Sequence, residues 1–273
     1  RSRRKGAAIA EDTQVHIWIG TFRGLNKNNV HDYHQYFCTD ASLGLPDNQI
    51  THLLRDSKNR FWVGTVNGVC LYTDKDNFRI IPIEADNKNV RQILEDRNGR
   101  IFLSTGFQLY AYHPREEKIT CVLPEICTGN TFYAQCHIAP DNNLWVMTST
   151  GLRCYDLSTL QLKESVALSG YPYYSYLHNN ELWITGNHTL SIFDTRTRSF
   201  KPLPQPIARN TPLCNADIDY INPYGNNDLL MKTARPGMFY YNPGTGSMTR
   251  QGTHGIHIEM HRFRISRMFT QPK

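Results

Sequence analysis

Four short apolar runs separated by turns, in residues 50–81, constrain the fold of this chain more than any other feature. Asn67-Gly68 joins two of the runs, and Asn-Gly between alternating apolar residues is the strongest short-range signal for a β-hairpin. Four antiparallel strands in about thirty residues form a sheet that cannot bury both of its faces alone. Such a sheet needs neighbours of its own kind. The four runs are Ile50–Leu54, Phe61–Val63, Val69–Tyr72 and Phe78–Ile81.

The same pattern recurs six times along the chain. With Trp62 as the anchor, the equivalent positions lie 38 to 47 residues apart, at Trp18, Phe102, Trp145, Trp183 and Leu230. A threonine stands three residues after the anchor in every repeat except the fifth, which has Gly186: Thr21, Thr65, Thr105, Thr148 and Thr233. An aromatic residue stands ten after it in every repeat except the first, which has Asn28: Tyr72, Tyr112, Tyr155, Phe193 and Tyr240. A repeat near forty residues with four strands per unit predicts an all-β chain folded as a β-propeller.

We assign structural roles to the repeated anchor residues and to the aspartates that precede them. An aspartate stands six residues before the anchor in the first three repeats, at Asp12, Asp56 and Asp96, whereas the fourth shows a shorter turn at residues 141–143. Aspartate at a tight turn accepts hydrogen bonds from backbone N–H groups. The large flat anchors are expected to fill the space between neighbouring blades, and the repeated threonines to bond or pack locally.

The blades are expected at residues 7–37, 49–82, 90–123, 133–168, 174–203 and 216–250. Residues 264–270 overlay on residues 49–55, so we expect the first strand of a seventh blade within 263–273, in a truncated seven-bladed propeller. Residues 1–6 are expected to be a basic tail or junction. Because the first residue is Arg, we expect the chain to be a piece of a longer protein.

Composition excludes several classes of protein. The 273 residues are 40% hydrophobic and 11% aromatic, enough for one large core. The sequence contains no run of eighteen apolar residues, so we expect no membrane span in it. Residues 1–5 supply four of the positive charges behind the net charge of +6. The other basic residues are scattered through the sequence and do not form a continuous basic stripe, so we expect no nucleic-acid partner. Seven cysteines without a C-x-x-C pair predict no metal site, and we expect no cofactor. Cys70 and Cys154 occupy matching third-strand positions, where a small buried residue is expected.

Residues 50–72 resemble the two-component regulator propeller repeat, as do Ile17–Leu25 and the lead-in Leu43–Asn48. The resemblance covers residues 8–270, is sharpest in the first two blades and is weakest in the last two. It implies the periplasmic sensor region of a hybrid two-component receptor, associated with glycan sensing. The membrane anchor and histidine kinase would then lie elsewhere in the protein. It also implies pairing of sensor regions into a homodimer, without contact between this segment and the membrane.

Propeller geometry directs attention to one face. The turns between second and third strands, and the connections between blades, gather there, and ligands favour loop-lined sites on rigid scaffolds. Sugars stack on aromatic rings and bind polar side chains at their hydroxyl groups. The tyrosines could instead face the blade interior. The candidate ligand-binding residues are Arg23, Tyr171, Tyr173, Tyr174, His188, Arg209, Arg235, His254 and His257.

Two other functions stay open from sequence. A polysaccharide lyase or glycosidase on this scaffold would need carboxylates converging on one bond. The aspartates lie mostly in repeated turns, so we expect no catalytic residue and no enzyme activity in this chain. A passive protein-interaction propeller is the other alternative, and fold alone does not separate these functions.

Overall fold

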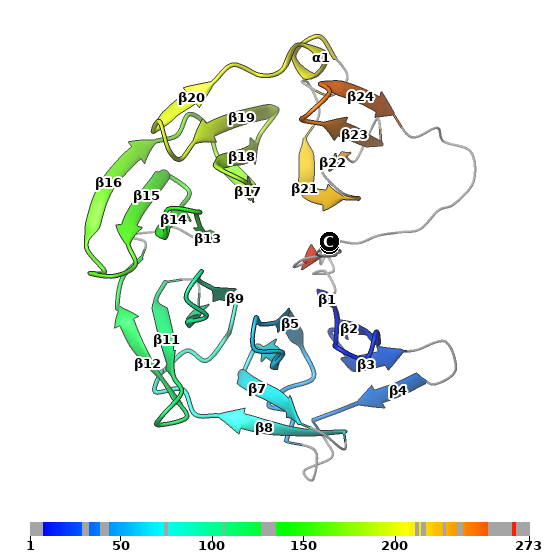
Figure 1. The fold of residues 1–273 in the computed structure, drawn as a ribbon, viewed down its shortest axis with the longest axis vertical. Coiled ribbons are helices and arrows are strands. Elements are labelled where there is room, and N and C mark those ends of the chain that lie inside the picture. The colour runs from blue at the N-terminus through cyan, green and yellow to red at the C-terminus, as the bar shows by residue number, and fades with distance from the viewer. Residues whose placement is uncertain are drawn as a thin grey trace. The chain divides into compact units, whose positions relative to one another are not determined.

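The computed structural model describes residues 8–28, 33–38, 44–73, 76–105, 107–126, 135–210, 213, 217–225, 228–233, 237–250 and 264–265. These residues form five four-stranded antiparallel sheets, a sixth that one additional strand extends to five strands, and one short helix, α1 (Gln205–Ala208). The predicted all-β architecture of four-stranded blades is therefore confirmed (Figure 1). The sheets divide into two compact units, residues 1–130 with 260–266 and residues 131–259 with 267–273, which are described separately below.

The first unit contains blades 1 to 3. Within it, the first strands of the blades, β1, β5 and β9, lie beside one another, and the fourth strands lie outermost in their sheets (Figure 1). Blade 1 consists of β1 (Ala8–Glu11), β2 (Ile17–Thr21), β3 (Gly24–Asn28) and β4 (Tyr33–Tyr36). Blade 2 consists of β5 (Ile50–Arg55), β6 (Phe61–Thr65), β7 (Gly68–Thr73) and β8 (Asn77–Ile81). Blade 3 consists of β9 (Gln92–Glu95), β10 (Ile101–Ser104), β11 (Leu109–His113) and β12 (Lys118–Leu123).

The second unit contains blades 4 to 6. Its first strands, β13, β17 and β21, again pack beside one another in order. Blade 4 consists of β13 (Gln135–Ile138), β14 (Asn143–Met147), β15 (Gly151–Asp156) and β16 (Leu162–Ala167). Blade 5 consists of β17 (Pro172–His178), β18 (Glu181–Gly186), β19 (Thr189–Asp194) and β20 (Ser199–Lys201). Blade 6 consists of β21 (Ile218–Tyr224), β22 (Asp228–Thr233), β23 (Met238–Asn242) and β24 (Ser247–Arg250).

A further short strand, β25 (Arg264–Ile265), lies within the segment expected to begin a seventh blade. It pairs with β1 in parallel, which makes the sheet of blade 1 five-stranded. First strands of neighbouring blades run in the same direction, so this orientation is consistent with the first strand of a seventh blade.

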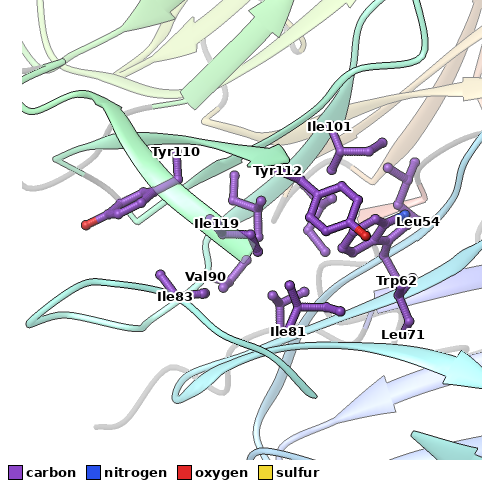
Figure 2. Packing of buried hydrophobic residues seen from close by; sticks show 13 residues of the cluster. Leu54, Trp62, Leu71, Ile81, Ile83, Val90, Ile101, Tyr110, Tyr112 and Ile119 are labelled. Atoms are coloured by element: carbon purple, nitrogen blue, oxygen red, sulfur yellow. The ribbon is translucent and has the colours of Figure 1, made fainter. Parts of the chain in front are cut away.

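The repeated tryptophans pack against the next blade within each unit, as predicted. Their exposed fractions are at most 1%. Each ring meets the aromatic residue on the third strand of the following blade, with ring centroids 4.7 to 5.8 Å apart. The four pairs are Trp18–Tyr72, Trp62–Tyr112, Trp145–Phe193 and Trp183–Tyr241. Figure 2 shows Trp62 beside Tyr112, among aliphatic side chains of blades 2 and 3.

Blade 6 departs from the predicted spacing by one residue. Tyr241, eleven residues after Leu230, pairs with Leu229 and contacts Trp183, whereas Tyr240 lies against Tyr224. The reason is the turn after β22, where Thr233 bonds to a glycine four residues later rather than three. In blade 6 the aromatic residue that contacts the preceding blade's tryptophan is therefore Tyr241 and not Tyr240.

The repeated threonines close the turns between second and third strands. The hydroxyl of Thr65 donates to the carbonyl of Gly68 at 2.9 Å, and Thr21 and Thr148 make the same bond to the glycine three residues later. The expectation of a local role is confirmed. Cys70 and Cys154 are fully buried on third strands, as expected.

The turn aspartates bond to the tryptophan rings as well as to backbone. Asp56 accepts backbone N–H groups of Lys58 and Arg60 on Oδ1, and its Oδ2 accepts Trp62 Nε1 at 2.8 Å. Asp12 makes the equivalent bond to Trp18, also at 2.8 Å. Burial pushes the pKa of Asp12 upward, but its hydrogen bonds outweigh burial, so the pKa lies below its ordinary value.

Blade 4 keeps this turn but lacks its acceptor. Ala139 stands six residues before Trp145 and makes the same pair of backbone bonds across the turn as Asp56 does. The turn therefore has the same length as in blade 2, and the shorter turn expected from the sequence is wrong. Asp141 instead bonds to Asn143. As a result, the Nε1 atom of Trp145 is buried without a partner among the described residues, as is that of Trp183 in blade 5.

A polar cluster joins the outer strands of blades 1 and 2. Asp76 accepts hydrogen bonds from Tyr36 and Tyr72 hydroxyls, each at 2.7 Å, and from Lys27 Nζ at 3.1 Å. Burial raises the pKa of Asp76, but these three bonds outweigh burial and lower it to about 2. The cluster thus holds one carboxylate ionised between two blades.

Candidate functional site

Strand β17 begins with a bulge that turns one tyrosine outward. Pro172 pairs with Gly186 and Tyr174 with Thr185, which leaves Tyr173 without a partner on β18. A bulge at the rim of a sheet redirects a side chain. Tyr173 is 50% exposed and Tyr171, just before the strand, is 74% exposed. These two rings point away from the blade interior, although the sequence left the opposite orientation open.

The one glycine that breaks the threonine pattern lies under this bulge. A Cβ atom at Gly186 would stand 2.8 Å from the carbonyl oxygen of Tyr171 and 2.5 Å from Thr189 Oγ1. Threonine at this position would therefore clash with the backbone that carries the exposed tyrosines. The exception at Gly186 allows the chain before β17 to lie close against the end of β18.

The neighbouring turn holds His188 in a strained conformation. Residues 187–188 connect β18 to β19, and His188 has φ of 51°, which is uncommon outside glycine. Its backbone N–H donates to Asp217 Oδ1 at 3.0 Å, and its Nδ1 lies 3.6 Å from the same oxygen. Asp217 directly precedes β21 of blade 6, so a side chain of one blade fixes the turn of the previous one.

Two further contacts lie near this end, one within blade 5 and one between blades 5 and 6. The hydroxyl of Tyr173 lies 3.5 Å from Asn187 Oδ1, and that of Tyr174 lies 3.4 Å from the buried Asn222 on β21. Strand β21 carries the same bulge as β17, with Asp219 in the place of Tyr173. We call the group formed by Tyr171, Tyr173, Asn187, His188 and Asp217 the tyrosine face.

The structure thus brings four of the predicted ligand-binding residues to one end of blade 5: Tyr171, Tyr173, Tyr174 and His188. Arg23 is exposed at the turn between β2 and β3, in the other unit. Arg209 is exposed at the end of helix α1, which packs against the outer strand β24. Arg235, His254 and His257 lie outside the described residues.

Sequence reasoning missed Asp217 and Asn187, because neither residue occupies a repeated position. The signal that could have pointed to them was Gly186, the only repeat without threonine three residues after the anchor. A loss of a repeated side chain marks a blade that accommodates something the other blades do not.

The chemistry of the tyrosine face suits binding. Two exposed aromatic rings offer apolar surfaces, and amide, imidazole and carboxylate groups beside them offer hydrogen bonds. In the described part of the chain, no group of three or more His, Cys, Asp or Glu residues could hold a metal ion. No helix in that part has the length and apolar character needed to cross a membrane.

Comparisons with known proteins agree with this architecture. The chain is similar in fold to the extracellular domain of BT3049 from B. thetaiotaomicron, assigned as a hybrid two component system, with 18% identity and a TM-score of 0.71. The match covers 92% of this chain but only 35% of that one. The extracellular domain of BT4673 from the same organism, assigned as a one component system, matches with 15% identity and a TM-score of 0.53, over 90% and 42% of the two chains.

An enzyme shares the fold as well. Catalytically inactive virginiamycin B lyase from Staphylococcus aureus, solved with quinupristin, matches with 15% identity and a TM-score of 0.69, over 95% of this chain and 87% of the lyase. No curated protein matches the chain. Residues 44–67, which span the lead-in and the first half of blade 2, match the family described as two component regulator propeller. The chain is therefore a β-propeller that carries the two component regulator propeller repeat.

Proposed function

We propose that this chain is the extracytoplasmic ligand-binding propeller of a two-component signalling receptor, and that it recognises an oligosaccharide at the tyrosine face. The repeat in blade 2 and the likeness in fold to extracellular domains of two component systems support the sensory role. The signal would pass to a histidine kinase outside this chain. A periplasmic location follows from the same proposal.

The binding proposal rests on two energetically unfavourable features of the tyrosine face. Tyr171 and Tyr173 expose large rings to solvent, and His188 is held at positive φ by Asp217. Strained backbone beside exposed aromatic rings is typical of ligand sites, because the strain fixes the groups before the ligand arrives. Rigid aromatic rings are also the side chains that stack on sugars.

A thermal-shift screen against oligosaccharides, combined with a turnover assay, tests the proposal. A ligand that binds only the folded protein raises the melting temperature, and a binder leaves the sugar intact. Tyr173→Ala should remove the shift, because it removes one stacking surface. Tyr224→Ala is the matched control: it removes a tyrosine of similar exposure, 52%, at the opposite end of β21 in the same unit.

An enzyme of the lyase type is the second candidate, because virginiamycin B lyase matches over most of both chains. Release of product in the turnover assay would favour this function over sensing. A melting temperature that no oligosaccharide raises, or a shift that Tyr173→Ala leaves intact, would count against the tyrosine face as the sugar site.

Paired sensor regions would give the receptor a route for its signal. Ligand binding can change the population of two arrangements of a homodimer. We expect this chain to dimerise, and light scattering with and without a bound oligosaccharide measures it. A monomer at all concentrations would contradict this part of the proposal.

A further inference from the structure

The charges at the tyrosine face are unevenly distributed. Asp217 uses one carboxylate oxygen, Oδ1, to hold His188, and its Oδ2 has no hydrogen-bond partner among the described residues. Asp217 is 46% exposed, so solvent and ligands reach it. Its fixed position distinguishes it from a mobile surface carboxylate, because the backbone bond to the strained turn orients it.

A second carboxylate lies close by along β21. Asp219 occupies the bulged position of that strand and is half-buried. The adjacent strand β17 carries Tyr173 at its own bulge, and the two strands pack side by side. Lys232, the described cation of β21 and β22, lies on β22 opposite Tyr220 and therefore close to Asp219. Among the described residues, the rim next to the tyrosines carries two carboxylates, one imidazole and one lysine, and Asp217 is the carboxylate that contacts the imidazole.

We infer that Asp217 sets the charge class of the ligand: the tyrosine face takes sugars with a free amino group best and rejects acidic sugars. This inference rests on the proposed function and deepens it. An ammonium group bound over Tyr171 or Tyr173 gains from both the ring faces and the nearby carboxylate. A uronic acid or sulfated sugar in the same place would lie beside a fixed negative charge. Like charges placed side by side at an interface repel each other and weaken binding.

The test uses three sugars with the same ring and different charge. Glucosamine, glucose and glucuronate are titrated at millimolar concentrations while NMR follows tyrosine ring signals, assigned through Tyr171→Phe and Tyr173→Phe. We expect affinity to fall in the order glucosamine, glucose, glucuronate. The two ends should differ roughly tenfold, since attraction of one charge and repulsion of the other each change affinity a few-fold at a half-exposed carboxylate.

Asp217→Asn separates this inference from a general charge effect. The variant keeps an oxygen that can accept the bond from His188 but loses the charge, so the preference should shrink to within about twofold. Asp228→Asn, which removes a carboxylate at the opposite end of blade 6, should leave the preference unchanged. Equal binding of all three sugars, or a preference that persists in Asp217→Asn, overturns the inference and leaves the sugar site standing. Absence of any tyrosine shift with all three sugars overturns the sugar site itself.

Discussion

The bond between the turn aspartate and the tryptophan ring offers the sharpest test of how a blade is held. Replacing Asp56 with alanine removes the acceptor of Trp62 Nε1, two backbone bonds and the ion pair with Arg60, whose N–O distance is 2.6 Å. The Asp56 side chain has no exposed surface, so water cannot replace all of these partners. A buried donor that loses a charged acceptor costs about 1.5–3 kcal/mol. With the partly exposed backbone bonds added, we expect a total of about 3–5 kcal/mol.

A double-mutant cycle isolates the bond to the ring. Trp62→Phe removes the indole N–H but keeps an aromatic anchor, as blade 3 does naturally with Phe102 after Asp96. Urea unfolding followed by circular dichroism gives the free energy of unfolding of the two single variants, the double variant and the parent. We expect a coupling energy of about 1–2 kcal/mol between positions 56 and 62. Strictly additive effects would show that the carboxylate acts only on the turn and would refute the claim that its bond to the indole N–H stabilises the blade.

Three further predictions follow from local geometry. Val15 is β-branched, 70% exposed and held at φ of 63°, a backbone conformation that asparagine adopts more easily than valine. Val15→Asn should therefore raise the free energy of unfolding by about 1 kcal/mol in urea melts. A loss of stability would show that valine is not strained at this position. Gly186→Thr should abolish oligosaccharide binding and lower the melting temperature, because the new side chain must displace the backbone of Tyr171. Undiminished affinity in calorimetry would contradict it. Asp76 has a pKa lowered to about 2 because its hydrogen bonds outweigh burial, so its contribution to the free energy of unfolding is present above about pH 4 and is lost as the pH falls towards 2. Asp76→Asn should therefore make stability depend less on pH in this acidic range. An unchanged acid dependence would disprove this.

Much of the blade could be predicted because its structure repeats. Trp62, Asp56 and Thr65 each recur at fixed spacing in several blades, and a repeated spacing means one local geometry. The ring lies between blades, the carboxylate in the turn and the hydroxyl across the hairpin. The sequence could not reveal that the carboxylate and the ring bond to each other. That bond depends on the turn bringing back a residue six positions away.

The candidate site was predictable only in part, because function lies where the repeat fails. The tyrosines of residues 171–174 stood out by composition, and the structure shows which rings are exposed only through the bulge at Tyr173. Asp217 sits in a connection without repeated features, and its role comes from packing of β21 beside β17. Arg209 looked equivalent to the other polar loop residues, but helix α1 carries it to the outer strand of blade 6.

Amide hydrogen exchange with and without a bound oligosaccharide from the thermal-shift screen measures directly where the sugar sits. If the tyrosine face is the binding site, exchange should slow at residues 171–178 and 186–189 and stay unchanged at the turn after Tyr224. Protection confined to blades 1 to 3, or to the outer strands β16 and β20, would place the sugar elsewhere and contradict the proposed site.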